Sequence, residues 1–291
     1  MDIELRAIRE SDHPRAAQII FDAFAGIAQR HNFPPDMPVI DIPRGLLTAF
    51  TGRPEIYAVA AEAGGKLLGV NFLDCRTPVG GVGPIAVDPA TQAKGIGRRL
   101  MQAVIDEGKR RGLRSVRLCQ DAFNSCSMSL YASLGFEVTE PLALVRGTPN
   151  DKPASAGATV RPVTDNDLEA CAALCRAAHG FDRTGELRES KALFGSTLLE
   201  RNGRVVAYAS APTFWILNHA VAQTDQDLFD LLLGCAAAAG SEPLSMLIPI
   251  RRAGLFRWCL SQGLRVVKPM TLMSTGEYQE PKTPFWPSVQ F

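Results

Sequence analysis

The sequence has little of what marks most specialised protein classes. Its 291 residues carry 31 Lys and Arg against 30 Asp and Glu, so the formal net charge is only +1. Without an excess of one sign, there is no bulk attraction to nucleic acid or to an anionic membrane surface. Aromatic residues make up 7% of the chain, charged residues 21% and hydrophobic residues 46%. This balance is typical of a soluble globular protein with ample core.

Long apolar runs and paired cysteines are missing as well. The first six residues, MDIELR, are charged and contain no apolar core of a signal peptide, so we expect no secretory signal. The longest apolar stretches, such as residues 231–239, are too short to span a bilayer. The seven cysteines are odd in number and lack C-x-x-C spacing. We therefore expect reduced core thiols, no metal, no membrane partner and a cytoplasmic location.

Residues 85–100, IAVDPATQAKGIGRRL, form the most informative stretch. A short apolar strand ends at Asp88-Pro89, and the pair Gly95-x-Gly97 then opens a segment with apolar residues at helical spacing. The start of a helix offers unpaired N–H groups and the positive end of the dipole, which together suit a phosphate. The stretch is neither a Walker A loop nor the dinucleotide fingerprint. An ordinary strand–turn–helix is the alternative.

The flanking residues predict a regular order of elements. Alternating and helical patterns indicate, in turn, a strand over 3–9, a helix capped by Ser11-Asp12, a proline-rich loop over 31–43, a hairpin of 56–61 and 66–73, a strand over 83–87, the helix after Gly95, a strand over 115–119, and a short helix and final strand within 124–138. The expected order is strand, helices, three strands, helix, strand, helix, strand.

Two motifs in this order resemble one known family. Q-x-x-G-x-G at residues 92–97 follows an apolar strand, and N-S-C-S-M-S-L-Y at 124–131 continues to L-G-F-E at 134–137. Because of these two motifs and the order of elements around them, residues 3 to about 145 resemble the GCN5-related N-acetyltransferase (GNAT) superfamily. The resemblance implies an α/β (α+β) fold, in which a mixed, mostly antiparallel sheet is flanked by helices.

The second half of the chain looks like a divergent copy of the first. Residues 159–168 repeat the pattern of 5–12, a hairpin is expected over 193–209, and residues 255–266 echo 130–138. We expect a catalytic domain over 1–146 with the acyl-CoA site, a polar linker over 147–158, and a degenerate GNAT-like domain over 159–291. This copy has no glycine-rich turn before its helix at 227–239, and Phe256 takes the tyrosine position. Its aromatic tail, from residue 276, is expected to dock on its own domain or near the interdomain cleft.

The resemblance also implies a donor site for acetyl-CoA, without a metal. The backbone of Ile85, Ala86 and Val87 would lie beside the pantetheine arm, and the N–H of Ala86 or Val87 would stabilise the oxyanion. The turn and helix start would wrap the pyrophosphate through Gln92, Ala93, Lys94, Gly95, Ile96, Gly97 and Arg98. Plain surface exposure is the alternative for Lys94 and Arg98.

The second motif supplies the remaining candidates. Asn124 and Ser127 would contact the cofactor, although Asn124 suits the cap of the short helix equally well. Tyr131 matches the general acid of the family and would also contact the cofactor, and core packing is its alternative. The strand before the glycine turn lacks a carboxylate, so the base is open: water, or His31, Asp36 or Asp74 by position alone.

The sequence thus predicts acetyl transfer from acetyl-CoA to a primary amine of a small molecule, by direct attack in a ternary complex. One alternative acceptor is a protein or peptide amine. An alternative from another class is a non-catalytic acyl-CoA-binding sensor or interaction module. The charge balance argues against nucleic-acid partners, and the sequence leaves open a homodimer, the acyl chain length and the acceptor.

Overall fold

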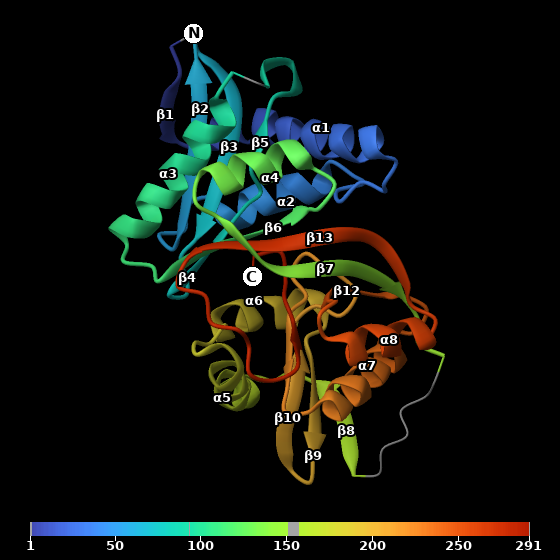
Figure 1. Cartoon of the computed structure of the whole chain (residues 1–291). Coiled ribbons are helices and arrows are strands. Elements are labelled where there is room, and N and C mark those ends of the chain that lie inside the picture. Colours follow the sequence, from blue (N-terminus) through green and yellow to red (C-terminus); the bar gives the residue numbers. More distant parts are fainter. Residues whose placement is uncertain (1, 93, 151–156, 291) are drawn as a thin grey trace. The chain divides into compact units, whose positions relative to one another are not determined.

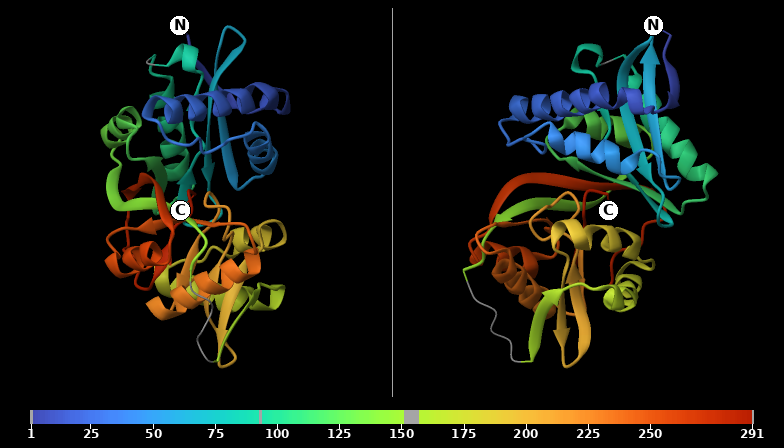
Figure 2. Two further views of the ribbon diagram at one scale, coloured as in Figure 1. Left: turned by 90° about the vertical axis from the view of Figure 1, so that its right-hand side faces the viewer. Right: turned by 180° about the vertical axis from the view of Figure 1, so that it is seen from behind.

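The computed structural model describes residues 2–92, 94–150 and 157–290, which form two compact units. Unit 1 comprises the residues up to Glu137 together with Ser274–Gly276. Unit 2 comprises Val138–Met273 and the residues from Glu277 onward. In each unit, helices pack on β-strands (Figures 1 and 2).

The units divide the chain earlier than the domains expected from the sequence. Strand β7 (Glu137–Gly147) falls almost entirely in unit 2, whereas the sequence analysis ends the first domain at residue 146. Of the expected linker at 147–158, residues 151–156 lie outside the described residues. A division by compactness does not test which domain is catalytic, so that assignment stays a prediction.

Unit 1 follows the predicted order of elements. They are β1 (Glu4–Ala7), α1 (His13–His31), α2 (Asp41–Phe50), β2 (Ile56–Ala63), β3 (Lys66–Asp74), β4 (Val79–Val82), β5 (Ala86–Val87), α3 (Ile96–Arg110), β6 (Ser115–Asp121) and α4 (Ser125–Ser133). The sheet runs β1-β2-β3-β4-β6, with β5 beside β3. These strands pair antiparallel except for β4 with β6, which confirms the mixed, mostly antiparallel sheet.

Strand β3 is buried on both faces because helices cover both sides of the sheet. Side chains alternate along a strand, and Val70 and Phe72 belong to the apolar cluster formed with α1 and α2. The residue between them, Asn71, faces α3, and its Nδ2 donates to the carbonyl of Leu100 at 3.3 Å. A Cβ at Gly69 would come within 3.1 Å of Leu100, so α3 approaches the sheet where β3 has no side chain.

One strand of the sequence analysis is interrupted in the structure. Of the expected strand over 83–87, only Ala86 and Val87 form a strand, β5, and Gly83–Ile85 separate it from the end of β4 at Val82. Along β3 the pairing advances three residues, from Leu73 to Val70, while the opposing chain advances four, from Val82 to Ala86. One extra residue on one strand is a β-bulge, which bends the strand and redirects its backbone groups.

Unit 2 contains the remaining elements, except for Glu137 of β7 and Ser274–Gly276 of β13, which belong to unit 1. These elements are β7, β8 (Ala158–Pro162), α5 (Leu168–His179), α6 (Thr184–Phe194), β9 (Thr197–Arg201), β10 (Arg204–Ala209), β11 (Ala220–Ala222), α7 (Asp225–Ala239), β12 (Leu244–Pro249), α8 (Ala253–Ser261), β13 (Arg265–Gly276) and β14 (Phe285–Trp286). Its strands form two runs, β13-β7-β12 and β14-β11-β10-β9-β8. The hairpin expected from residue 193 begins only at Thr197, because Leu193 and Phe194 end α6 and Leu193 is 76% exposed.

A partly buried ion-pair motif ties the start of unit 1 to its sheet. The two terminal nitrogens of Arg6 donate to the carboxylate of Asp12 at 2.6 and 2.9 Å. The guanidinium also binds Glu62 of β2, and the N–H of Arg9 donates to Asp12 at 2.7 Å. Asp12 therefore holds Arg6 and does not cap α1 through its side chain, which corrects the capping expected from the sequence.

Unit 2 repeats this motif with the same spacing. Arg161 donates to both oxygens of Asp167 at 2.8 Å and to Glu200 of β9 at 3.0 Å. The N–H of Thr164 donates to Asp167 at 2.9 Å, as that of Arg9 does to Asp12. In both units the aspartate follows its arginine by six residues. This common detail supports the internal repeat.

The later helices also correspond between the units. Helices α3 and α7 are both 15 residues long, and α4 and α8 are both 9. Tyr131 is the seventh residue of α4, and the seventh of α8 is Cys259. Gly135 and Gly263 follow these residues at the same distance. The equivalent of Tyr131 is therefore Cys259, which corrects the expected Phe256.

Candidate functional site

Three segments of unit 1 meet at Gly97, the second residue of α3. A Cβ added there would lie 3.5 Å from Leu130 Cδ2 of α4 and 3.9 Å from Val87 Cγ2 of β5. Leu130 directly precedes Tyr131, so the glycine turn, the interrupted strand and the tyrosine helix belong to one place in the fold. The two sequence motifs, more than 25 residues apart in the chain, thus form one candidate site.

The start of α3 is open to solvent. Gly95, the residue before the helix, has a φ of +78°, which side-chain-bearing residues rarely adopt. The first N–H groups of the helix, on Ile96, Gly97 and Arg98, have no acceptor within it, and Gly95 has no side chain that could cap them. Lys94 and Gly95 are exposed and Ile96 is buried. Predicted site residue 93, an alanine, lies outside the described residues.

Two predicted side chains bind protein groups around this turn. Gln92 Nε2 donates to the carbonyl of Val87 at 3.4 Å, which links the turn to β5. Arg98 Nη2 donates to Ser133 Oγ at 2.8 Å, which links the first turn of α3 to the last residue of α4. Both side chains are exposed, so these two hydrogen bonds connect the segments of the site at its surface.

The pairing of β5 decides which of its N–H groups face the site. The N–H of Asp88 donates to the carbonyl of Leu68 on β3 at 2.8 Å. Because successive N–H groups on a paired strand point to alternate sides, Ala86 also faces β3, where Val70 is its partner. The N–H of Val87 therefore points away from β3, and so does that of Ile85. Of the two oxyanion candidates, the geometry favours Val87.

Asn124 and Ser127 have structural partners at the start of α4. Asn124 Oδ1 accepts a hydrogen bond from the N–H of Ser127 at 3.2 Å, so the capping interpretation of Asn124 is confirmed. The cap uses the amide oxygen, which leaves Nδ2 as the group that Asn124 can offer to a ligand. The side chain of Ser127 hydrogen-bonds that of Tyr131. Ser127 therefore orients the predicted acid.

Tyr131 is buried, with 6% of its surface exposed. Burial raises the pKa of its hydroxyl to about 12; the hydrogen bond with Ser127 lowers it, and the nearby charge of Asp121 raises it. The ring lies 6.2 Å from that of Phe136, centroid to centroid. Asp121, the last residue of β6, is a carboxylate near Tyr131 that the sequence analysis missed; its position at a strand end just before Asn124 was the available signal.

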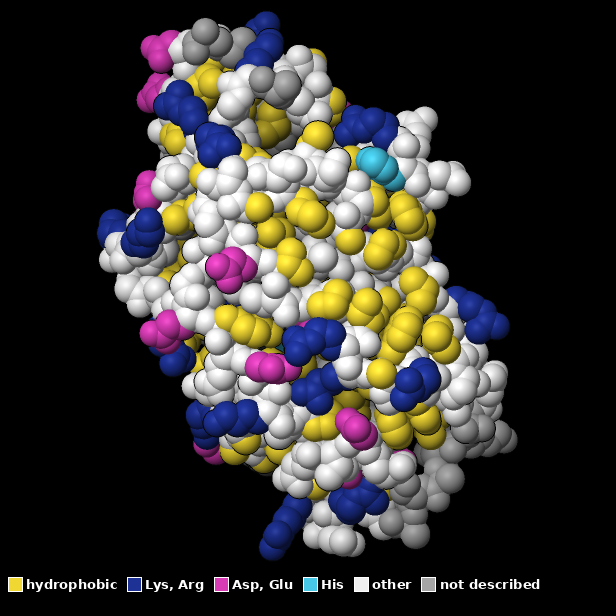
Figure 3. Space-filling view, in the orientation of Figure 1, with side chains coloured by type: hydrophobic (Ala, Val, Ile, Leu, Met, Phe, Trp, Pro, Cys, Tyr) yellow, Lys and Arg dark blue, Asp and Glu magenta, His cyan; other side chains and the backbone are white. Residues whose placement is uncertain are grey.

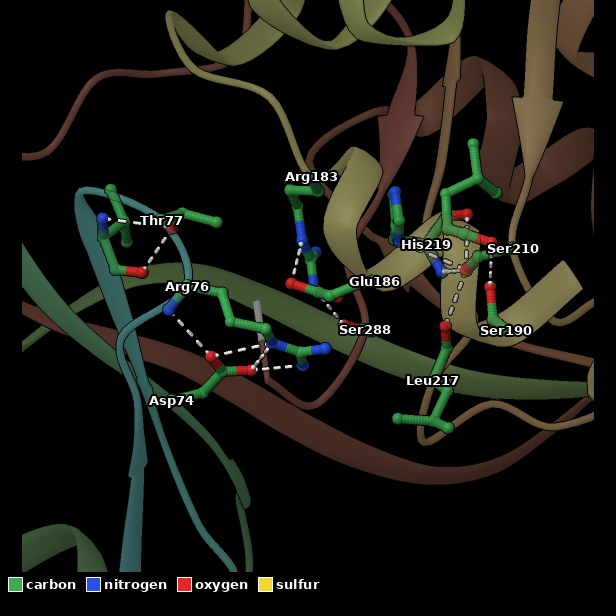
Figure 4. Close-up of polar contacts among 12 residues, drawn as sticks. Asp74, Arg76, Thr77, Arg183, Glu186, Ser190, Ser210, Leu217, His219 and Ser288 are labelled. Atoms are coloured by element: carbon green, nitrogen blue, oxygen red, sulfur yellow. Dashed lines mark hydrogen bonds and ion pairs between the residues drawn. The ribbon is translucent and has the colours of Figure 1, made fainter. Parts of the chain in front are cut away.

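The base candidates lie in different surroundings. His31 ends α1, is exposed, and has its ring centroid 5.1 Å from that of Phe123. Phe123 stacks on Phe33 at 4.2 Å and directly precedes Asn124, so this aromatic group adjoins the start of α4. Asp74 is buried and binds Arg76 through both carboxylate oxygens (Figure 4). That ion pair removes Asp74 from the candidates for a free base.

The described residues give little support for a metal site, a membrane-spanning segment or a surface of one charge. Among the described residues, no group of three or more His, Cys, Asp or Glu could hold a metal ion. The seven cysteines are free thiols. The helices that the structure describes include none long and apolar enough to cross a membrane. On the face drawn in Figure 3, basic and acidic side chains are interspersed.

Comparison with known proteins finds a family match within unit 1. The model of the acetyltransferase (GNAT) family matches residues 22–136. The mycothiol acetyltransferase of Kocuria rhizophila is 36% identical over 94 residues, 30% of this chain and 31% of that protein. The ribosomal protein bS18-alanine N-acetyltransferase of Escherichia coli K12 is 46% identical over 52 residues, 18% of this chain and 35% of that protein. The chain thus spans about a third of the length of these relatives.

The fold of the whole chain is shared with a solved structure. A tandem GNAT protein from the clavulanic acid biosynthesis pathway superposes with a TM-score of 0.60 at 12% identity. The match covers 96% of this chain and 100% of that one. At this identity the likeness shows the fold alone, and it confirms two tandem domains of this type.

Proposed function

Because residues 22–136 belong to the acetyltransferase (GNAT) family, we propose that the chain is an acyl-CoA-dependent N-acyltransferase and that its donor is acetyl-CoA. The proposed acceptor is a primary amine of a small molecule, which attacks the thioester directly in a ternary complex. The observation that carries this proposal is the convergence at Gly97, where the open helix start, β5 and the helix of Tyr131 meet.

The donor site proposed here is built from backbone and basic groups. The uncapped N–H groups at the start of α3 would hold the pyrophosphate, and Lys94 adds positive charge beside them. Gly97 leaves free the space next to Val87 and Leu130 that a side chain would fill. Asn124 Nδ2 would donate to an amide carbonyl of the pantetheine arm. These groups complement the negative charge and the hydrogen-bonding groups of an acyl-CoA.

The proposed chemistry needs an oxyanion donor and an acid. The N–H of Val87 would stabilise the negative charge that develops on the thioester oxygen. Tyr131 would give its proton to the departing thiolate, and its raised pKa keeps it protonated at physiological pH. The same burial disfavours a thiolate and raises the pKa of the CoA thiol, so that the two groups shift together.

The attacking amine must lose a proton, and Asp121 is the carboxylate we propose for this step. It ends β6 and lies near enough to Tyr131 for its charge to raise the pKa of the tyrosine. A water between Asp121 and the amine would carry the proton. His31 is the second candidate, because it adjoins Phe123 at the start of α4.

Product formation tests the proposal. The protein is incubated with acetyl-CoA and a panel of small amines, and free thiol and acetylated amine are measured. We expect equal amounts of both products with at least one amine. Gly97→Asp should abolish them, because it puts a carboxylate at the phosphate site. Gly45→Asp, at an exposed glycine of α2 with open space around it, is the matched control.

A peptide acceptor is the second candidate, favoured by the 46% identical relative that is named for acetylating an alanine of a ribosomal protein. The panel therefore includes a peptide with an N-terminal alanine. Acetylation of this peptide alone would replace the small-molecule proposal. Binding of acetyl-CoA without product from any amine or peptide would instead support the non-catalytic sensor.

A further inference from the structure

We infer that unit 2 keeps the cleft of the fold but uses it to bind the chain's own C-terminal segment, with Phe285 and Trp286 in the place that the pantetheine arm takes in unit 1. This inference rests on the proposed function only for what unit 1 binds there. The position of the segment within unit 2 stands on contacts of its own.

The cleft in question lies between the two runs of strands in unit 2. By chain order, β11 corresponds to β5 of unit 1, and β12 corresponds to β6. In unit 1, β5 pairs only with β3 among the described strands, and no described strand lies between it and β6. In unit 2, β14 occupies this position: it pairs with β11 and also contacts β12.

Strand β14 fits into the sheet of unit 2 as a regular member. Trp286 pairs with Ala220 and Phe285 with Val221 in antiparallel register. The N–H of Ala222 donates to the carbonyl of Pro284 at 2.9 Å. Both aromatic side chains are about 1% exposed. The segment is therefore bound by main-chain pairing and by burial, in the manner of a peptide that extends a sheet.

The two aromatic rings fill opposite faces of this sheet. Trp286 belongs to the core cluster that includes residues of α7, β12 and α8. Phe285 faces the other side, where its ring lies 5.4 Å from that of His179 at the end of α5. The indole N–H of Trp286 has no hydrogen-bond partner among the described residues. Large, mainly apolar side chains therefore fill the cleft at this point.

The residue before α8 differs from its counterpart in unit 1, and it contacts the C-terminal segment. Asn124 caps α4 in unit 1, and the equivalent residue before α8 is Arg252. Arg252 Nη2 donates to the carbonyl of Pro281 at 3.0 Å, and its guanidinium lies 5.1 Å from the centroid of the Phe285 ring. A residue position that would hold the cofactor in unit 1 thus holds the C-terminal segment in unit 2.

The helix start that would bind phosphate in unit 1 is closed in unit 2. Thr224 takes the place of Gly95, and its hydroxyl accepts a hydrogen bond from the N–H of Asp227 at 3.1 Å. Exposed Asp225 adds negative charge to the first turn, and Asp227 in the same turn is ion-paired with Arg201. A capped and acidic helix start repels a phosphate. Phosphate loop and pantetheine cleft are therefore both unavailable to acyl-CoA in unit 2.

Hydrogen exchange on the full chain, with and without acetyl-CoA, tests this inference. We expect the amides of β14 to exchange slowly in the free protein and to stay unchanged on addition of acetyl-CoA, while residues 94–100 become protected. Faster exchange of β14 on addition of acetyl-CoA would overturn the inference, because the ligand would then displace the segment. So would β14 amides that exchange like an unfolded peptide in the free protein. No protection of residues 94–100 would contradict the proposed function alone.

A variant pair adds a second readout. Trp286→Ala should speed exchange of the β14 amides at least tenfold and leave the protection of residues 94–100 by acetyl-CoA within twofold of the unmodified chain. Trp258→Ala is the matched control, since Trp258 stacks on Phe229 and lies outside β14. Unchanged β14 exchange in Trp286→Ala would overturn the anchoring role. If that variant does not fold, the exchange of the unmodified chain decides.

Discussion

At the scale of single residues, Tyr131 carries the most specific part of the account. Tyr131→Phe keeps the ring and its packing but removes the only proton the residue can donate. We expect turnover to fall about 10²- to 10⁴-fold, the usual contribution of a positioned acid, while acetyl-CoA affinity changes less than about threefold. Tyr57→Phe, at a half-buried position of β2, is the control. Equal turnover of the two variants would remove Tyr131 from the acid role.

The pKa of Tyr131 also predicts the shape of the pH profile. A tyrosine in water has a pKa of about 10 and would lose its proton above that pH. Burial raises the pKa of Tyr131 to about 12, so it stays protonated, and competent as an acid, through pH 10. We expect no loss of turnover from its ionisation between pH 8 and 10.5. A basic limb near pH 10 that disappears in Tyr131→Phe would contradict this.

Single residues also show where sequence reasoning ends. Gly95 and Gly97 could be chosen from their spacing, because a helix start that binds phosphate needs small residues there. Asp121 and the Ser127–Tyr131 hydrogen bond could not, because they depend on where β6 ends and how α4 turns toward it. Asp74 is a base candidate by its position in the sequence, but its carboxylate forms an ion pair with Arg76, which lies two residues away.

At the scale of elements, the glycine turn and α3 carry the proposed phosphate site. Gly95→Ala forces a side chain into a φ of +78°, although open space surrounds the Cβ. We expect a loss of about 1 kcal/mol in the free energy of unfolding. We also expect weaker acetyl-CoA binding, because the first N–H groups of α3 would then point in a different direction. Gly45→Ala, inside α2, should stabilise by about 0.5–1 kcal/mol. Urea unfolding and calorimetry measure both effects.

The repeated ion-pair motif gives a prediction about acid stability. Hydrogen bonding to Arg6 lowers the pKa of Asp12, so the pair stabilises the fold above the unfolded pKa of about 3.9 and this contribution is lost as pH falls below it. Arg6→Met leaves two carboxylates without their partner and should cost about 1–3 kcal/mol at pH 7. The difference from the unmodified chain should shrink at pH 3.

The control for this prediction is an exposed pair. Arg44→Met removes a surface ion pair with Asp41, with an N–O distance of 3.0 Å, and should cost less than about 1 kcal/mol. Arg161→Met tests the copy of the motif in unit 2 and should lower stability in the same pH range as Arg6→Met. A cost for Arg6→Met that is the same at pH 7 and pH 3 would show that packing, and not charge, stabilises this corner.

The elements were predictable from the sequence to the extent that local signals set them. The hairpin of β2 and β3 and the helix after Gly95 follow from periodicity and glycine punctuation. The bulge between β4 and β5 depends on the register in which both strands pair with β3, and periodicity does not contain that information. Likewise, the aromatic tail signalled burial by its composition, but its place beside β11 depends on contacts far apart in sequence.

At the scale of the whole molecule, the chain carries two copies of one fold and, in this account, one donor site. The copies share their ion-pair motif and helix lengths, yet they differ where unit 1 has Gly95, Asn124 and Tyr131, because unit 2 has Thr224, Arg252 and Cys259 there. The sequence indicated this asymmetry through the missing glycine turn. The structure adds that β14 lies in the second cleft.

One titration tests the central claim most directly. Acetyl-CoA is added to the intact chain in a calorimeter, beside Gly97→Asp and the control Gly45→Asp. The account predicts one acetyl-CoA bound per chain, the same stoichiometry in Gly45→Asp, and none in Gly97→Asp. Absence of binding to the intact chain, or binding that survives in Gly97→Asp, would contradict it.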